Sequence, residues 1–528
     1  MITGGEKTRK SSFSKKVRSQ GLSRGGGSTL GGKDITTLRG TLDYLEQEGE
    51  LLKTDAEIDP IYEIAGVEKA LENGPAILFN NIKGYPNARD AGNLFARKDR
   101  LAKIFDVDTH QNTKFKFLKA IKHPLAPKVV EAAPCQEVVL TENLDVLATI
   151  PIIKHTEKDA GRILGGGIIF LGGEYFDGGS HISLNRVHFR GKDWASISTG
   201  LEYHLYKSVG VKHRGKKVPI TINIGNSPAV CECAGGAGTH TMIPPGSDEL
   251  AIAGALQGKP VEIVKARTVD AYAIADSEWV IEGYIDTSTK VWESDESEQN
   301  QKADTYPFFP EWPGYLGRAY KVFRFQVTAI THRSDRPIFY SPLADSYEGL
   351  LLGLPFREAC LYEEANRLYP GLVQDVNILY GMGGWSSAVY QIKKRRPADE
   401  GYQKNVLLTA FGTLPGCRIA MAVDEDIDIY CAEDLLWALS TRVDPTKDIF
   451  FIPGKAHAFI PVARYNPETQ ALAIDATAPF QYKFLFERAH YPVDRVDVNR
   501  WFGKEEVTRA LAQQLDSERA VSMAKNGW

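Results

Sequence analysis

The stretch from about residue 134 to 337 constrains the fold most, because it reads almost entirely as β-strand. Gly-rich turns separate its strand-like segments, and only one segment in it, from Ser247 to Leu256, predicts a helix. A run of this kind favours a β-barrel or a sandwich as the middle domain. The predicted strands cover residues 138–140, 163–171, 181–189, 219–224, 261–269 and 322–331.

The segment before this stretch has an α/β pattern. Leu38, Leu42 and Leu45 fall at helical spacing, which predicts a first helix. Residues 57–71 predict a turn followed by a second helix, and residues 76–79 predict a short buried strand. We therefore expect a separate N-terminal α/β domain.

The first residues of the chain have a different composition. From Lys7 to Arg24 there are seven Lys or Arg residues and no acidic residue, and a Gly-rich segment follows. Such a segment buries too little apolar surface to fold, so we predict a disordered basic tail. A targeting peptide is the alternative interpretation, which the absence of a clear apolar face disfavours.

Helices and strands alternate again beyond residue 337, which predicts a second α/β domain. A last amphipathic helix is predicted from Lys504 to about Met523, with Val507, Leu511 and Leu515 on one face. A terminal helix of this kind often packs on a neighbouring subunit. The predicted elements that precede it cover residues 358–368, 373–380, 405–411, 419–423 and 432–440.

At 528 residues the chain is too long for one ordinary core, so several domains are expected. The predicted fold class is a multidomain protein with α/β and β parts. We divide it into a basic tail (1–34), an N-terminal α/β domain (35–130), a β-rich middle domain (131–336), a C-terminal α/β domain (337–500) and a C-terminal helix (501–528).

Composition excludes several classes of protein. The content of 43% hydrophobic and 25% charged residues is typical of a folded soluble protein, and no apolar run approaches the roughly 20 residues that cross a bilayer. The formal charge of −4 gives no reason to expect nucleic acid. Six cysteines in so long a chain do not predict a disulfide framework. Cys231 and Cys233 are weak evidence for a metal site, and we interpret them as buried strand residues in a cytoplasmic protein.

The most informative stretch runs from His181 to Arg190. Polar residues alternate at 181, 183 and 185 and then, one residue out of phase, at 186, 188 and 190. A β-bulge within one strand produces such a slip, and bulges often re-aim side chains at active sites. An edge strand with one solvated face is the alternative interpretation.

Two further positions could join His181 at a site. His204 and Glu249 supply a second imidazole and a carboxylate, and this set could bind a divalent cation with positions left for a phosphate. The alternative interpretation is that each residue has only a structural role. Glu249 would be an ordinary acid in the first turn of a helix, and His204 an ordinary buried histidine.

Glu311 lies among aromatic residues and prolines in the segment PFFPEWPGY, residues 307–315. Partial desolvation would make such a carboxyl group a useful proton donor. Arg186 could bind a substrate carboxylate through two parallel hydrogen bonds. The alternative is an ordinary loop acid beside a packed aromatic cluster.

Several motifs together resemble the UbiD-like, prenylated-FMN-dependent decarboxylases of the aromatic-acid type. They include TLRGTLDYLEQEGELL near the start and DEDIDIY in the last third of the chain, and they occur in family order. The series is specific although no single motif is. The matching segments are residues 37–52, 74–95, 151–162, 424–430, 436–442 and 474–477.

The resemblance implies three domains, with prenylated FMN bound on a split β-barrel in the middle one. It implies that Arg186 is the catalytic arginine and that His181, His204 and Glu249 bind a divalent metal beside a potassium ion. Manganese is usual in the family, and His181 in place of the usual Asn could favour Fe2+. The implied cofactor-binding residues are Ser183, Asn185, Arg186, Tyr203, His204, Thr241, Met242 and Lys393.

The sequence departs from the family at the acid motif. The family pattern EGPFGE reads here as YPFFPE, residues 306–311. The second glutamate, the implied proton donor, is kept as Glu311. The first, which normally pairs with the arginine, is missing unless Asp304 takes its role.

The resemblance predicts a carboxy-lyase that reversibly decarboxylates an aromatic or heteroaromatic acid, including polycyclic, hydroxybenzoate or acyl-CoA-linked acids. Phe308, Phe309, Trp312 and Tyr315 favour a bulky aromatic acid over a small acrylic one. The expected partners are that acid, CO2, a flavin prenyltransferase that supplies the cofactor, and further copies of the chain in a homodimer or homohexamer. Two alternatives stay open: a conventional FMN oxidoreductase, and a non-catalytic subunit of a multi-subunit carboxylase.

Overall fold

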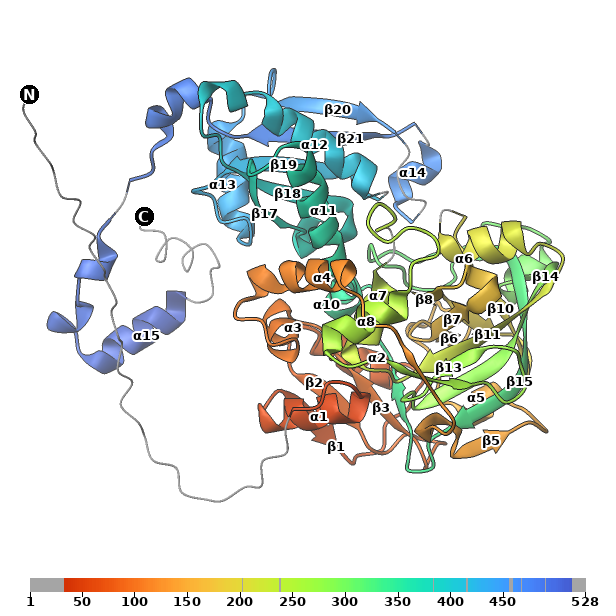
Figure 1. The fold of residues 1–528 in the computed structure, drawn as a ribbon. Coiled ribbons are helices and arrows are strands. Elements are labelled where there is room, and N and C mark those ends of the chain that lie inside the picture. The colour runs from red at the N-terminus through yellow and green to blue at the C-terminus, as the bar shows by residue number, and fades with distance from the viewer. Residues whose placement is uncertain are drawn as a thin grey trace, which may run out of the picture. The chain divides into compact units, whose positions relative to one another are not determined.

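A computed structural model describes residues 33–201, 203–236, 239–382, 384–414, 416–454, 459–466, 468–489 and 491–514. Residues 1–32 of the predicted basic tail and the end of the predicted terminal helix lie outside these residues. Residues 34–528 form one of two units of the chain, and the description below concerns that unit. It is a multidomain α/β protein with an N-terminal part, a β-rich central part and a C-terminal α/β part (Figure 1).

The N-terminal part contains a four-stranded sheet, counted over the described residues, in the order β1-β2-β3-β16. The first predicted helix is confirmed as α1, and its N-cap residue Thr37 accepts a hydrogen bond from the Gly40 amide at 2.8 Å. The predicted strand at 76–79 is confirmed as β2, which is fully buried. The strands are β1 Leu51–Thr54, β2 Ala76–Phe79, β3 Arg89–Gly92 and β16 Ile338–Tyr340, and the helices are α1 Leu38–Gln47, α2 Glu63–Ala70, α3 Lys98–Ile104 and α4 Thr113–Lys122.

Strand β16 comes from far along the chain, yet it completes this N-terminal sheet by pairing in parallel with β3. Ser341, directly after β16, is consequently buried against β3. The segment that follows leads through α10 (Tyr347–Leu351) into the C-terminal part. A sheet of one region thereby anchors the connection between the other two.

The central part is dominated by a sheet that has nine strands among the described residues, with the path β6-β9-β10-β15-β14-β11-β7-β8 and β5 paired to β15 (Figure 1). The predicted strand at 163–171 is two strands, because Gly165, Gly166 and Gly167 interrupt it. The longest strand, β14, was not predicted. The strands are β5 Val138–Leu140, β6 Ile163–Leu164, β7 Ile168–Gly172, β8 Ser180–Leu184, β9 Val187–Phe189, β10 Trp194–Ile197, β11 Lys217–Ile224, β14 Trp279–Trp292 and β15 Lys321–His332.

The phase slip predicted as a bulge is instead a break between two strands. β8 ends at Leu184, β9 begins at Val187, and the two pair with different neighbours. β8 lies at one end of the sheet path and β9 next to the other end. A link of two residues spans at most about 11 Å, so both ends of the sheet approach each other at Asn185 and Arg186.

Short elements cover this sheet. The predicted helix after Ser247 is confirmed as α8, which Asp248 caps by accepting from the Ala251 amide. Helix α7 was not predicted, and it holds Cys231 and Cys233, which are buried in a helix and not in a strand. The helices are α5 Val146–Thr149, α6 His204–Tyr206, α7 Pro228–Gly235, α8 Glu249–Gln257 and α9 Asp295–Gln299, and a small sheet contains β4 Lys128–Val130, β12 Glu262–Lys265 and β13 Tyr272–Ile274.

The C-terminal part contains a sheet of five strands, counted over the described residues, in the order β17-β18-β19-β21-β20. Ala388 and Tyr390 of β18 pack with α11 and α12, whereas Val389 packs with α13, so the two faces of the sheet bury alternate residues. The elements are α11 Leu354–Leu368, β17 Val373–Asn377, β18 Ser387–Ile392, α12 Tyr402–Thr413, β19 Ile419–Asp424, α13 Ala432–Arg442, β20 Ile449–Pro453, α14 Pro461–Tyr465, β21 Gln470–Ala476 and α15 Lys504–Gln514. No helix in the described part of the chain is both long and apolar enough to span a bilayer.

Candidate active site

A cavity lies where the central sheet, helices α6 to α8 and the C-terminal part meet. The break between β8 and β9 opens directly onto it, because Leu184, Asn185 and Arg186 all line it. Its polar lining comes mainly from the central part, and Trp385 extends its aromatic lining from the C-terminal part. The stretch singled out by its alternating polar residues therefore borders this cavity.

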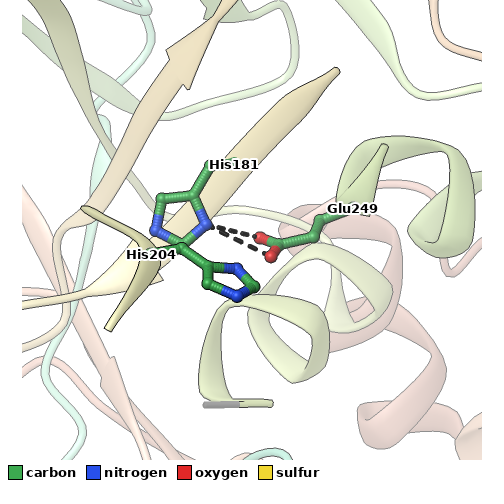
Figure 2. Close-up of side chains that lie close together, drawn as sticks. All are labelled: His181, His204 and Glu249. Atoms are coloured by element: carbon green, nitrogen blue, oxygen red, sulfur yellow. Dashed lines mark hydrogen bonds and ion pairs between the residues drawn. The ribbon is translucent and has the colours of Figure 1, made fainter. Parts of the chain in front are cut away.

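His181, His204 and Glu249 converge at one end of this cavity (Figure 2). They come from β8, the start of α6 and the start of α8, and their potential ligand atoms lie within 4.8 Å of one another. His181 Nδ1 lies 3.1 Å from a Glu249 carboxylate oxygen, and the Ile182 amide donates to that carboxylate at 2.7 Å. The structure thus brings together the three residues that the sequence singled out separately.

The chemistry of this group suits a divalent cation. Among the described residues, the Nε2 atoms of His181 and His204 are buried and have no hydrogen-bond partner. Burial, with His240 and His181 nearby, lowers the pKa of His204 to about 3, so its imidazole is neutral at physiological pH. A neutral imidazole is the form that binds a metal, and two imidazoles with one carboxylate suit Mn2+ or Fe2+. The residues present therefore fit a metal ion.

Arg186 lies beside this group, between two glutamates. Its Nε and Nη2 donate to Glu293 at 3.0 and 2.8 Å, and its Nη1 donates to Glu311 at 2.5 Å. Burial acts to lower the pKa of Arg186, but the two carboxylates raise it above its usual value. The ring of Phe308 lies 4.7 Å from the guanidinium carbon and covers it. Arg186 is thus a permanent, tightly oriented cation.

Glu293 was not identified from the sequence. It directly follows β14, and the Tyr320 amide donates to its carboxylate at 2.7 Å. Burial raises the pKa of Glu293 above its usual value, although Arg186 opposes the shift. The only available signal was its position at the end of a strand that the pattern did not predict. No motif surrounds it.

Asp304 does not take the role expected of it, and this expectation is corrected. Its carboxylate accepts hydrogen bonds from Tyr320 Oη at 3.1 Å and from Arg464 Nη1 at 2.9 Å, and it is half exposed. It lies in a surface loop, where these partners hold it away from Arg186. Glu293 pairs with Arg186 in its place.

Glu311 has the surroundings that its sequence context predicts. It is 7% exposed, lines the cavity and follows the buried residues Phe308 and Phe309. A Cβ atom at Gly317 would lie 2.6 Å from Glu311 Oε1, so the glycine leaves space for the carboxylate. Of the other aromatic residues considered, Trp312 lines the cavity, whereas Tyr315 is exposed and does not.

Three of the predicted cofactor-binding residues line the cavity beside these groups: Ser183, Asn185 and Tyr203. Ser183 Oγ donates to Asn185 Oδ1 at 2.8 Å, and Asn185 Nδ2 donates to the Ser198 carbonyl at 2.9 Å. These bonds fix the Asn185 amide at the break between the strands.

The three other predicted cofactor contacts, Thr241, Met242 and Lys393, do not line this cavity and stay predictions. Thr241 is exposed, and neither it nor Met242 is among the described residues that line the cavity. Lys393 directly follows β18, is 47% exposed and pairs with Glu425 at 2.9 Å. Sequence position alone put these residues at the site, and the local turn directs Thr239 and His240 to the cavity instead.

A buried group of two histidines and a glutamate that could hold a metal ion lines the same cavity as an arginine held by two glutamates, and together they define an enzyme site suited to a carboxylate and a proton. Comparison with known proteins also indicates an enzyme. Three family models match consecutively: the 3-octaprenyl-4-hydroxybenzoate carboxy-lyase N-terminal domain over residues 42–115, its Rift-related domain over 128–344 and its C-terminal domain over 350–476. The chain belongs to the UbiD family of carboxy-lyases, which are decarboxylases.

Individual relatives cover nearly the whole chain. The gallate decarboxylase of Lactiplantibacillus plantarum is 32% identical over 492 residues, which are 86% of this chain and 96% of that protein. The apo structure of a 3,4-dihydroxybenzoic acid decarboxylase from Enterobacter cloacae is 29% identical, with a TM-score of 0.80 over 90% of this chain and 100% of the other. An evolved dimeric form of the UbiD-class enzyme HmfF from Pelotomaculum thermopropionicum, in complex with prFMN, is also 29% identical, with a TM-score of 0.77 over 88% and 100% of the two chains.

Proposed function

We propose that this chain catalyses the reversible, non-oxidative decarboxylation of an aromatic or heteroaromatic carboxylic acid with prenylated FMN. The arginine and its two glutamates, at the polar end of an aromatic-lined cavity, are the observation that carries the proposal. The relatives that act on gallate and 3,4-dihydroxybenzoic acid support an aromatic substrate. Polycyclic and acyl-CoA-linked acids belong to the same proposal.

Arg186 binds the substrate carboxylate in this proposal. A guanidinium presents five N–H donors, and here Glu293 takes two of them while Glu311 takes one. Because Glu311 accepts one N–H group of Arg186 and Glu293 accepts two, the bond between Nη1 and Glu311 is the one that an incoming carboxylate displaces. Glu293 keeps Arg186 in place during the exchange.

Glu311 then serves as the acid. After CO2 leaves, it delivers a proton to the carbon that carried the carboxylate, and in the reverse direction it removes that proton. Phe308, Phe309 and Trp312 are buried around it and exclude water from the transfer. The chain thus supplies orientation, a dry site and a proton.

Prenylated FMN, when bound, supplies the electron sink for the pair left by departing CO2. His181, His204 and Glu249 would hold the divalent ion, manganese or Fe2+, that helps to bind the cofactor, with potassium nearby. Ser183, Asn185 and Tyr203 would line the same pocket. The close approach of the sheet ends at Asn185 supports a split β-barrel as the binding scaffold.

The wider proposal keeps the division into a basic tail, three domains and a terminal helix. It includes a homodimer or homohexamer, supply of the cofactor by a flavin prenyltransferase, and a cytoplasmic location. The dimeric form of HmfF supports the assembly.

One observation favours a second candidate, a conventional FMN oxidoreductase. HmfF has also been solved in complex with FMN, and that structure has a TM-score of 0.79 with this chain. The third candidate, a non-catalytic subunit, rested on the missing first glutamate. Glu293 removes that support because it supplies Arg186 with a second carboxylate.

The test is a mass spectrum of the cofactor released from protein co-expressed with a flavin prenyltransferase, followed by assays of CO2 release from aromatic acids. Prenylated FMN, CO2 release and exchange of deuterium into the product support the proposal. Plain FMN with redox turnover contradicts it in favour of the oxidoreductase, and a chain that binds no flavin contradicts both.

A further inference from the structure

The aromatic end of the cavity is built around an indole from the C-terminal part. Trp385 lies in a short 3-10 turn, Gly384–Ser386, between β17 and β18, and it lines the cavity together with Trp312 of the central part. The ring centroids of the two indoles are 5.3 Å apart and the ring planes are 31° apart. Two segments far apart in sequence therefore form one aromatic wall.

Trp385 is held from several directions. Its Nε1 donates to the Leu350 carbonyl at 2.9 Å, and the guanidinium carbon of Arg357 lies 3.8 Å from its ring centroid. A cation placed so close to an indole face stabilises the ring position, and more so when the cation is desolvated. These contacts give the wall a fixed orientation before any ligand arrives.

Burial and hydrogen bonds fix the Arg357 side chain in this position. It is 3% exposed and lies in α11, where it donates to the carbonyls of Gly235 at 3.0 Å and Leu352 at 3.3 Å. Both of those residues line the cavity. Burial lowers the pKa of Arg357 to about 10, so it stays charged at neutral pH. Within the described residues it forms no ion pair, and the aromatic ring that its guanidinium covers is that of Trp385.

The wall lies directly beside the acid of the proposed reaction. Trp312 follows Glu311 in sequence, and both line the cavity. A ligand whose carboxylate reaches Arg186 therefore has its remaining atoms next to the Trp312 and Trp385 pair. Flat, π-electron-rich surfaces prefer offset stacking or edge contacts with other aromatic rings.

We propose that Trp385 is a specificity-determining residue which, with Trp312, forms the wall that packs against the ring of an aromatic carboxylate, and that Arg357 is its positioning residue. This inference rests on the proposed function for the identity of the reaction. The recognition of a flat ring can nevertheless be measured without any turnover.

The binding test uses the flavin-loaded enzyme and two sulfonates, benzenesulfonate and cyclohexanesulfonate, which carry a stable anion in place of the carboxylate. Calorimetry gives the ratio of their dissociation constants. We expect wild-type enzyme to prefer the flat ring, Trp385→Ala to lose roughly two- to tenfold of that preference, and Trp385→Phe to keep most of it. An unchanged preference in Trp385→Ala overturns the proposal.

Trp437 provides a matched control. It lies in α13 of the same C-terminal part, the guanidinium carbons of Arg442 and Arg488 lie 5.4 and 4.6 Å from its ring, and it does not line the cavity. Trp437→Ala should leave the preference for the flat ring unchanged. An equal loss in Trp437→Ala and Trp385→Ala overturns the proposal, because the effect then comes from the fold and not from the wall.

Arg357→Lys tests the positioning role, since lysine keeps the charge but lacks the planar group that stacks on an indole. We expect KM for a single-ring acid to rise two- to tenfold in Arg357→Lys and in Trp385→Ala, with kcat changed less than twofold. A fall in kcat at constant KM overturns the proposal. If Trp385→Ala does not fold, Arg357→Lys decides, and an unchanged KM in that variant overturns the proposal.

The two readouts separate this inference from the proposed function. If the wild-type enzyme turns over no acid but prefers the flat ring, and Trp385→Ala loses that preference, the aromatic wall is supported and the decarboxylase function is contradicted. An active decarboxylase whose preference survives Trp385→Ala contradicts only the wall.

Discussion

Two buried groups of carboxyl side chains in this molecule avoid an unpaired buried charge in opposite ways. In the arginine cluster, defined as Arg186, Glu293 and Glu311, a guanidinium binds both carboxylates. In the acid cluster, defined as Glu68, Asp90 and Glu348, none of the described basic side chains forms an ion pair with the three carboxyl groups, which are at most 1% exposed. The first cluster borders the cavity and the second lies under the N-terminal sheet.

The acid cluster is held by hydroxyl and amide donors. Ser341 Oγ lies 2.7 Å from both Glu68 Oε1 and Asp90 Oδ1, although one hydroxyl group has only one proton to donate. Glu348 accepts from the Asn93 and Phe95 amides. Burial raises the pKa of Asp90 to about 8, and burial with the nearby Asp90 raises the pKa of Glu68 well above its usual value.

The difference between the clusters separates chemistry from architecture. Arg186 binds both carboxyl groups of the arginine cluster and orients them beside the cavity, where a substrate carboxylate can exchange with one of them. The acid cluster avoids charge by retaining protons, and it ties β3 to the segment after β16, in which Pro342, Ala344 and Gly349 line the cavity. We therefore expect changes in the first cluster to alter turnover and changes in the second to alter stability.

Replacing Arg186 by Met makes the arginine cluster resemble the acid cluster, and this change has the largest expected effect. Decarboxylation should fall by at least about 10³-fold, because the substrate carboxylate loses the guanidinium that binds it. Arg190→Met is the control, since Arg190, directly after β9, pairs with the exposed acids Asp295 and Glu298. Rates of CO2 release would be compared, and a similar loss in both variants would remove the special role of Arg186.

The two glutamates of the arginine cluster should differ from each other. Glu311→Gln should reduce turnover roughly 10²- to 10⁴-fold and suppress deuterium exchange into the product, because the proton donor is lost. Glu293→Gln keeps the acid and should cost less, roughly 10-fold, through weaker orientation of Arg186. A larger loss in Glu293→Gln than in Glu311→Gln would exchange the roles assigned to them.

The acid cluster predicts a dependence of stability on pH. Because folding raises the pKa of Asp90 from about 4 to about 8, the folded state binds more protons between these values, and the free energy of unfolding falls as pH rises through them. The slope from one such group is up to about 1.4 kcal/mol per pH unit. Asp90→Asn should reduce this slope of the unfolding free energy against pH, which urea unfolding at pH 5.5, 7.0 and 8.5 measures.

Asp59→Asn is the control for that slope. Lys83 and the Ile61 amide lower the pKa of Asp59, so its contribution to stability is lost only as pH falls below about 4. The slope between pH 5.5 and 8.5 should be unchanged in this variant. An Asp90→Asn protein with the wild-type slope would show that the acid cluster does not retain its proton.

Ser341→Ala gives the smallest expected effect. It removes the hydroxyl shared by Glu68 and Asp90 and should lower the free energy of unfolding by about 1 kcal/mol at pH 7, measured by urea unfolding. KM and kcat should stay within twofold of wild type, because Ser341 does not line the cavity. A selective loss of turnover would instead connect the acid cluster to the site.

Local patterns predicted the elements that depend on neighbours in sequence. Leu38, Leu42 and Leu45 predicted α1, and the apolar run at 76–79 predicted β2. The alternation from His181 to Arg190 identified the segment that borders the cavity, but not its break into β8 and β9. A bulge and a break produce the same slip in sequence, and only the pairing partners of each half distinguish them.

Pairs that depend on distant residues could not be predicted. Glu293 joins Arg186 from 107 positions away, and Trp385 meets Trp312 across two parts of the chain. Asp304 and Lys393 were assigned by alignment with family motifs, but local partners hold both elsewhere. Nothing in the sequence around Glu293, Trp385, Asp304 or Lys393 indicates which contacts these residues form.

By itself, the sequence determined the α/β, β-rich and α/β order of the chain, its family resemblance, and the residue types of the group that could hold a metal ion. Periodicity and motifs carry that information because they arise from contacts between near neighbours. The tertiary structure alone decided which carboxylates compensate Arg186, which acids stay without a cation, and which aromatic rings line the cavity. Those choices depend on burial and on partners supplied by other strands and helices, since the energy of a buried charge or ring is fixed by what surrounds it.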